Sequence, residues 1–184
     1  MYKLFDNLQS SAEIIKSGGV GIIKTDTIYG FVACAFNISA VERVYQIKHR
    51  SAAKKCIILA ADYEQLKPFN IDDYIMYKEK VNQYWPGPYS LVLPIVGNDF
   101  SYLTLDAPDL AFRVPQNDQL TDYLLQTGPL IAPSANLESK LTVESAQQAE
   151  QIFKDSVDFI VDGGKVINNK PSTLINMQTG QNLR

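Results

Sequence analysis

The sequence contains few of the residues that build disulfide frameworks and metal clusters. Only two cysteines, Cys34 and Cys56, and one histidine, His49, occur among 184 residues. The cysteines lie in apolar surroundings with no CxxC or Cys/His spacing, so we interpret them as buried reduced thiols. A single histidine cannot form a metal cluster, and no nearby nucleophile indicates a catalytic triad around it. The sequence therefore predicts no metal site, and we expect His49 to be a surface residue.

Long apolar runs and a strong charge of one sign are also missing. No stretch approaches 18 consecutive apolar residues, and the N-terminal segment carries Asp6. We therefore expect neither a membrane span nor a signal peptide, and a cytoplasmic location. A formal net charge of −3 disfavours broad, non-specific nucleic-acid binding but permits a local basic pocket.

The common nucleotide-binding signatures are missing as well. The chain has no GxxxxGK[ST] and no GxGxxG, and Gly163-Gly164-Lys165 is more typical of a turn. If a nucleotide binds, its phosphates must be held by side-chain cations and isolated backbone amides.

What the chain does contain indicates an α/β protein. At 184 residues with 46% hydrophobic content, we expect one domain spanning 1–184. Apolar runs predict strands at 20–23, 31–36, 56–61, 90–96, 110–114, 130–132, 157–161 and 173–177. Helical spacing predicts helices at 10–16, 39–48, 72–84, 117–126 and 143–154, the second of which begins at a capping box, Ser39 to Glu42. Because helices separate only some of the strands, we expect a mixed sheet flanked by helices.

Cations gather where the second of these helices ends. Lys48, Arg50 and Lys54 could face phosphate oxygens, with Arg50 offering a two-pronged fork. A solvated basic helix end that complements the helix dipole would look the same, and both interpretations stay open from composition alone.

Three further positions carry the same ambiguity. Arg113 lies inside an apolar strand, where it needs an internal partner such as Asp109 or the carboxylate of a ligand. Pro133-Ser134-Ala135-Asn136 follows a strand, where ligands of open sheets bind, but a plain turn has similar residues. Ser172-Thr173, before the last strand, permits both interpretations too.

Taken together and in this order, six short motifs carry a resemblance. They are Lys24-Thr25-Asp26-Thr27-Ile28-Tyr29-Gly30, Ile47-Lys48-His49-Arg50 with Lys54, Trp85-Pro86-Gly87-Pro88 with Leu91-Val92-Leu93-Pro94, Phe112-Arg113-Val114-Pro115, Ala132-Pro133-Ser134-Ala135-Asn136, and Ser172-Thr173. Over essentially its whole length the chain resembles the YrdC/TsaC family of threonylcarbamoyl-AMP synthases, in their short bacterial form.

The resemblance implies a twisted mixed sheet with a concave, positively charged cavity. It also implies that L-threonine, bicarbonate or CO₂, and ATP yield threonylcarbamoyl-AMP and pyrophosphate, with Mg²⁺ expected on the phosphates. Partner proteins would then transfer the threonylcarbamoyl group to the adenosine beside the anticodon of tRNA, which the synthase itself could contact transiently.

The resemblance also implies the role of each site residue. Lys48 and Arg50 would be catalytic, beside the phosphates. The residues implied for ATP are Arg50, Lys54, Ser134, Asn136, Thr142 and Arg184. The residues implied for threonine are Thr27, Arg113 and Ser172.

The chain departs from the family pattern after Asn136. A Ser-Gly-x-Pro-like turn is usual there, whereas this chain has Leu137-Glu138-Ser139-Lys140-Leu141-Thr142, which weakens the role implied for Thr142. Two alternatives remain: a non-catalytic RNA-binding module with the same cavity, and a carbamoyl-adenylate domain like those joined to hydrogenase maturation proteins. The net charge disfavours the first and the chain length the second.

Overall fold

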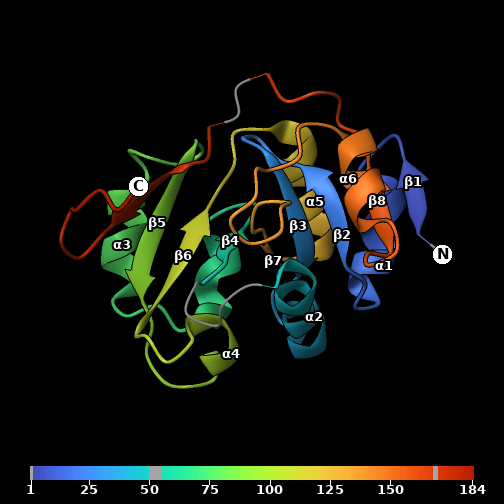
Figure 1. Cartoon of the computed structure of the whole chain (residues 1–184). Coiled ribbons are helices and arrows are strands. Elements are labelled where there is room, and N and C mark those ends of the chain that lie inside the picture. Colours follow the sequence, from blue (N-terminus) through green and yellow to red (C-terminus); the bar gives the residue numbers. More distant parts are fainter. Residues whose placement is uncertain (1, 50–54, 168–169) are drawn as a thin grey trace.

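Strands from all parts of the chain form one twisted mixed sheet (Figure 1). The structure is a computed structural model and describes residues 2–49, 55–167 and 170–184. Among these residues the sheet has nine strands in the order β1-β8-β2-β3-β7-β4-β6-β5-β9. The strands are β1 (Lys3–Phe5), β2 (Gly21–Lys24), β3 (Tyr29–Cys34), β4 (Ile57–Leu59), β5 (Tyr89–Pro94), β6 (Asp109–Arg113), β7 (Leu130–Ile131), β8 (Phe159–Val161) and β9 (Thr173–Asn176).

Parallel and antiparallel pairs alternate irregularly, which confirms the predicted mixed sheet. The parallel pairs are β1–β8, β2–β8, β4–β6 and β5–β9. The antiparallel pairs are β2–β3, β3–β7, β4–β7 and β5–β6. The two edge strands come from opposite ends of the chain, so the termini lie at opposite sides of the molecule (Figure 1).

Helices cover the sheet over two separate hydrophobic cores. They are α1 (Ala12–Lys16), α2 (Ile38–Lys48), α3 (Tyr74–Val81), α4 (Ser101–Thr104), α5 (Asp118–Thr127) and α6 (Ala146–Phe153), with 3-10 turns at Gln9–Ser11 and Glu64–Phe69. The larger core takes residues from α2, α3 and α6, and the smaller core takes residues from α1 and α5. Because successive strand side chains point to opposite faces, Ile22 belongs to the larger core and Ile23 to the smaller one.

Helix ends were the weakest part of the sequence-based prediction. The capping box at Ser39 is wrong, because α2 begins earlier. The side chain of Asn37 caps this helix by accepting from the Ala40 amide at 3.0 Å. The last predicted helix is shorter than expected, since Ser145 caps it and Ala146 begins it. Strand β1 was not predicted, because three residues carry too little pattern.

No helix in the described part of the chain is both long and apolar enough to cross a bilayer.

Candidate active site

The turn between β2 and β3 is built around one threonine hydroxyl. Thr25 Oγ1 accepts hydrogen bonds from the amides of Thr27 at 3.2 Å and Ile28 at 3.3 Å. It also lies 2.7 Å from the Ile28 carbonyl oxygen, to which it donates. A side chain that binds its own turn in this way fixes the local backbone. Thr27 and Ile28 are thereby held at the wall of a cavity.

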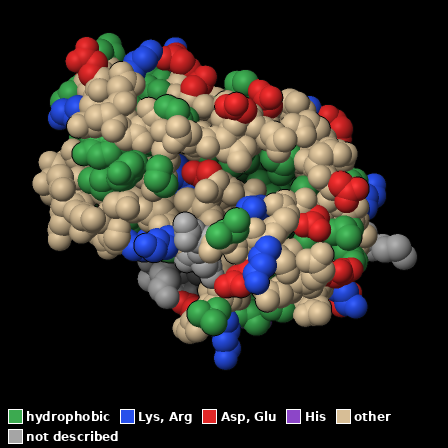
Figure 2. Space-filling model, turned by 90° about the horizontal axis from the view of Figure 1, so that it is seen from above, with side chains coloured by type: hydrophobic (Ala, Val, Ile, Leu, Met, Phe, Trp, Pro, Cys, Tyr) green, Lys and Arg blue, Asp and Glu red, His purple; other side chains and the backbone are tan. Residues whose placement is uncertain are grey.

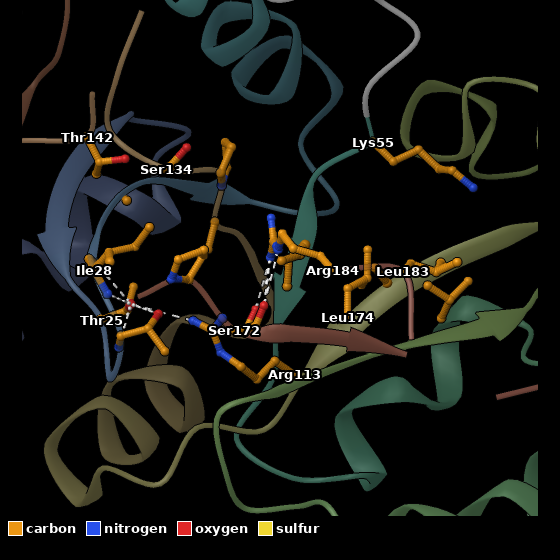
Figure 3. Close-up of a pocket in the computed structure, with 18 of the residues that line it drawn as sticks. Thr25, Ile28, Lys55, Arg113, Ser134, Thr142, Ser172, Leu174, Leu183 and Arg184 are labelled. Atoms are coloured by element: carbon orange, nitrogen blue, oxygen red, sulfur yellow. Dashed lines mark hydrogen bonds between the residues drawn. The ribbon is translucent and has the colours of Figure 1, made fainter. Parts of the chain in front are cut away.

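That cavity has a volume of about 600 Å³ (Figure 3). Four stretches of chain line it, together with side chains of the sheet: the β2–β3 turn, the loop after β7, the segment before β9, and the C-terminal residues. The lining residues are Thr25, Thr27, Ile28, Gly30, Lys55, Ile57, Val92, Ala111, Arg113, Ala132, Pro133, Ser134, Lys140, Leu141, Thr142, Pro171, Ser172, Leu174, Leu183 and Arg184. Four of them are cationic and none is acidic, counting only described residues, so the lining favours an anion.

Alternation along the strands explains why the cavity floor is part apolar and part charged. Ile58 in β4 and Phe112 in β6 pack into the larger core. Their neighbours Ile57, Ala111 and Arg113 point the other way and line the cavity. The sheet therefore presents a rigid strand, rather than a loop, beneath the site.

Arg113 lies at the end of β6 and is only 4% exposed. Its Nη2 donates to Asp26 Oδ1 at 3.0 Å and lies 3.5 Å from Thr25 Oγ1. The internal partner that the sequence suggested, Asp109, is wrong, because that carboxylate pairs with Lys55. Thus Asp26, in the β2–β3 turn, supplies the counter-charge to Arg113 in β6, which lies 87 residues further along the chain.

Burial governs the ionisation of this pair. Removal from water raises the pKa of Asp26, although the charge of Arg113 and its hydrogen bond act in the opposite direction. Burial likewise lowers the pKa of Arg113, which the Asp26 carboxylate offsets and the nearby Arg184 reinforces. The guanidinium therefore lies in a place where a second anion would be favourable.

The loop after β7 continues alongside β3. The Phe31 amide donates to the Pro133 carbonyl, and the Ala135 amide donates to the Tyr29 carbonyl, each at 2.9 Å. Gly30 faces this loop, and a Cβ there would lie 3.2 Å from the Pro133 oxygen. This close approach brings Ser134 to the cavity wall.

Lys48, the last residue of α2, binds the same loop. Its Nζ is buried and donates to the Ser134 carbonyl oxygen, to the Asn136 carbonyl oxygen at 2.8 Å and to Asn136 Oδ1 at 2.9 Å. The Asn136 amide in turn accepts from Ser134 Oγ at 2.7 Å and donates to the Lys140 carbonyl at 2.7 Å. The loop is therefore tied together by one ammonium group and one amide.

These contacts give Lys48 and Asn136 a different place from the expected one. Neither belongs to the cavity lining, since their polar atoms are used within the loop. Ser134 and Thr142, which the same resemblance implied for ATP, do line the cavity and are drawn near each other on one side of it in Figure 3. Arg50 and Lys54 lie outside the described residues.

Arg184 also departs from its expected neighbours. Its Nε and Nη2 donate to the Ser172 carbonyl oxygen at 3.2 and 3.1 Å, and Nη2 lies 3.2 Å from Ser172 Oγ. The Ser172 hydroxyl also shares a hydrogen bond of 2.7 Å with the buried Ser90. Arg184 therefore lies with the residues expected to bind threonine rather than with Ser134 and Thr142 (Figure 3).

Sequence reasoning missed several parts of the site. It assigned no role to Asp26 or Thr25, although both lie in a motif that was noticed. It also left out Lys55, Lys140 and Leu141 of the lining. Lys55 follows Lys48, Arg50 and Lys54 closely in the sequence, but only the fold shows that it lines the cavity.

Comparisons with known proteins show the family of the chain. The family model Sua5_yciO_yrdC, described as "Telomere recombination", matches residues 13–184. The chain is 31% identical to the threonylcarbamoyl-AMP synthase of Idiomarina loihiensis over 97% of each protein. It is 30% identical to the threonylcarbamoyl-AMP synthase of Pyrococcus abyssi, covering 92% of this chain and 50% of that protein.

Solved structures give the same result. The crystal structure of P. abyssi Sua5 complexed with L-threonine superimposes with a TM-score of 0.86 and 27% identity. The match covers 97% of this chain and 54% of the Sua5 chain. The present chain thus spans about half the length of the Pyrococcus proteins and nearly all of the Idiomarina one.

Proposed function

The chain belongs to the Sua5/YciO/YrdC family, and we propose that it is a threonylcarbamoyl-AMP synthase. Its substrates are L-threonine, bicarbonate or CO₂, and ATP, and its products are threonylcarbamoyl-AMP and pyrophosphate. The observation that carries the proposal is Arg113, a buried guanidinium at the wall of a cavity whose described lining has no acidic residue. We propose further that residues 1–184 act as a single catalytic domain.

The chemistry needs cations more than it needs a protein nucleophile. The amino nitrogen of threonine bonds to the carbon of CO₂ with release of a proton, or to the carbon of bicarbonate with release of water, which gives an N-carboxylate. An oxygen of this carboxylate attacks the α-phosphorus of ATP, and the bond to the β-phosphate oxygen breaks with release of pyrophosphate. Attack and departure both build negative charge, so fixed cations lower the barrier. Holding the two substrates in line supplies the entropic part.

The cavity divides between the two substrates. Thr27, Arg113 and Ser172 bind threonine, with Arg113 on its carboxylate. Ser134, Thr142 and Arg184 contribute to the ATP side together with Arg50 and Lys54. In this proposal Arg184 serves both substrates, which is supported by its hydrogen bond to the carbonyl oxygen of Ser172, a residue of the threonine side. Lys48 and Asn136 act indirectly by fixing the loop that carries Ser134.

Mg²⁺ and the downstream partners belong to the same proposal. No group of three or more metal-binding side chains occurs within the described ranges, so phosphates and water would supply most ligands of an Mg²⁺ bound with ATP. The adenylate then passes to transfer proteins that modify tRNA, in the cytoplasm.

Incubation with ATP, bicarbonate and radiolabelled threonine tests the activity directly. We expect a labelled adenylate and pyrophosphate in equal amounts, both dependent on threonine and on bicarbonate. Serine, which lacks the methyl group, serves as the matched substrate control. Pyrophosphate release that does not respond to threonine would contradict the proposal.

The alternative is a non-catalytic RNA-binding module. On the face shown in Figure 2, the coloured Lys and Arg side chains are interspersed with Asp and Glu and form no broad basic patch. Such a surface binds phosphate backbones weakly. Tight, salt-sensitive tRNA binding without threonine-dependent pyrophosphate release would favour the module.

A further inference from the structure

The guanidinium of Arg113 has more donors than the protein satisfies. Of its five N–H groups, only those on Nη2 have acceptors among the described residues. Nε is fully buried and has no partner there. A buried polar group without a hydrogen-bond partner lowers the free energy of unfolding. A protein that keeps such a group is therefore expected to use it in its function.

Asp26 holds the guanidinium of Arg113 in this arrangement. Its carboxylate accepts a hydrogen bond from Nη2. The donors on the other two nitrogens of the guanidinium have no acceptor among the described residues. Asp26 itself is absent from the cavity lining, although Thr25 and Thr27 on either side of it are part of that lining. The carboxylate therefore reaches Arg113 from outside the cavity.

The turn gives Asp26 little freedom. The Thr25 hydroxyl, on the residue before Asp26, accepts from the two amides that follow Asp26, those of Thr27 and Ile28. The Asp26 and Arg113 side chains are only 7% and 5% exposed, so neither can move far without opening the core. Two rigid elements, the β2–β3 turn and β6, are thereby joined through two hydrogen bonds of Arg113 Nη2, one to Asp26 Oδ1 and one to Thr25 Oγ1.

We infer that Asp26 is a positioning residue, which orients the guanidinium of Arg113 toward the carboxylate of the amino-acid substrate. This inference rests on the proposed function. Asp26 acts through geometry: by occupying Nη2, it leaves the remaining N–H groups for a second carboxylate. A guanidinium fork binds a carboxylate well only in the correct orientation, and a small misplacement weakens binding strongly.

Steady-state kinetics of three variants at position 26 test the inference. In Asp26→Ala the KM for threonine should rise at least tenfold, while kcat at saturating threonine and the KM for ATP stay within about twofold. Asp26→Asn keeps an oxygen that accepts from Nη2, so it should restore most of the threonine KM. Asp26→Glu keeps the charge but displaces it by one methylene, so it should perform worse than Asp26→Asn.

The Asn and Glu variants keep the test decisive even if Asp26→Ala does not fold. An Asn variant as impaired as Ala, or a Glu variant better than Asn, would show that charge rather than geometry matters and would overturn the inference. Equal rises in both KM values would do the same, since they indicate general damage to the structure. In the Arg113→Ala background, Asp26→Ala should add no further rise in the threonine KM.

Failure of the inference can be told apart from failure of the proposed function. Threonine binding by calorimetry needs no turnover, so it is measured on the same variants. Wild-type protein that binds threonine but makes no adenylate would reject the function and leave the role of Asp26 to be judged from the affinities. Wild-type protein that makes adenylate, together with Asp26 variants of unchanged threonine affinity, would reject only the inference.

Discussion

Two arginine–aspartate pairs in the described part of the chain have the same residue types but differ in exposure and in hydrogen bonding. Arg43 binds Asp158 through two nitrogens, at 2.6 and 3.1 Å, and also donates to the Ser156 carbonyl at 2.8 Å. Arg113 binds Asp26 through one nitrogen and leaves Nε without a described partner. The first pair is more than a third exposed on both sides, whereas the second is almost fully buried. The exposed guanidinium makes three hydrogen bonds through two nitrogens, whereas the buried one uses only Nη2 among the described residues.

The pKa values of the two carboxyl groups show the same contrast. Burial raises the pKa of Asp158, but the hydrogen bonds from Arg43 and the Val20 amide and the charge of Arg43 outweigh it, so the net pKa is lowered. For Asp26 burial prevails and the net pKa is raised. A lowered pKa means that the protein stabilises the ionised group, and a raised one means that it does not. The Arg43–Asp158 pair therefore stabilises the folded state at neutral pH, whereas the role of the Arg113–Asp26 pair in the site stays a proposal.

Arg113→Ala should have the largest effect and should act on function. Removing the guanidinium removes a charged hydrogen bond to the substrate carboxylate, so threonine binding should weaken by about 1.5–3 kcal/mol, or roughly 10- to 150-fold. Calorimetric titration of threonine measures this, and ATP affinity serves as the internal control. Unchanged threonine affinity in a folded variant would show that Arg113 does not bind the threonine carboxylate. The functional difference between the two arginine–aspartate pairs would then disappear.

Arg43→Ala should act on stability alone. It removes three hydrogen bonds from a partly exposed pair, so the free energy of unfolding should fall by about 1 kcal/mol. Urea denaturation measures the change, and the KM values for threonine and ATP should match the wild type. A loss of activity without a loss of stability would mean that the two pairs do not differ as described.

Asp158→Asn should have the smallest effect, and that effect should depend on pH. Because the folded pKa of Asp158 lies below its ordinary value of about 3.9, its stabilisation is complete above that value and is lost as pH falls through the folded pKa. The wild type should therefore exceed the variant by less than about 1 kcal/mol at pH 7, and the difference should shrink as the pH falls below about 3.9. Denaturation curves at several pH values check this; a difference that does not shrink on acidification would contradict it.

The sequence was sufficient for the fold class because apolar runs and helical spacing are local signals. Strands such as 20–23 and 110–114 were predicted within about one residue, since each is a short apolar run beside turn residues. Local signals failed where capping alternatives compete, as at Asn37 and Ser39.

The contacts within the site could not be predicted in the same way. Lys48 and Asn136 are 88 residues apart, and Arg113 and Asp26 are 87 apart, so only the closed sheet shows that they meet. The resemblance implied roles for particular residues without showing which of them line the cavity. Its place for Lys48 beside the phosphates stays a prediction; in the structure Lys48 Nζ donates to the Asn136 carbonyl oxygen.

The central claim is that the unfilled donors of Arg113 receive the carboxylate of threonine. Titration of the wild type and of Arg113→Ala with L-threonine and with L-threonine amide, whose carboxylate is replaced by a neutral carboxamide, tests it most directly. We expect the wild type to bind threonine at least tenfold more tightly than the amide, and the variant to bind both alike. Equal affinity of the wild type for the two compounds would contradict the claim.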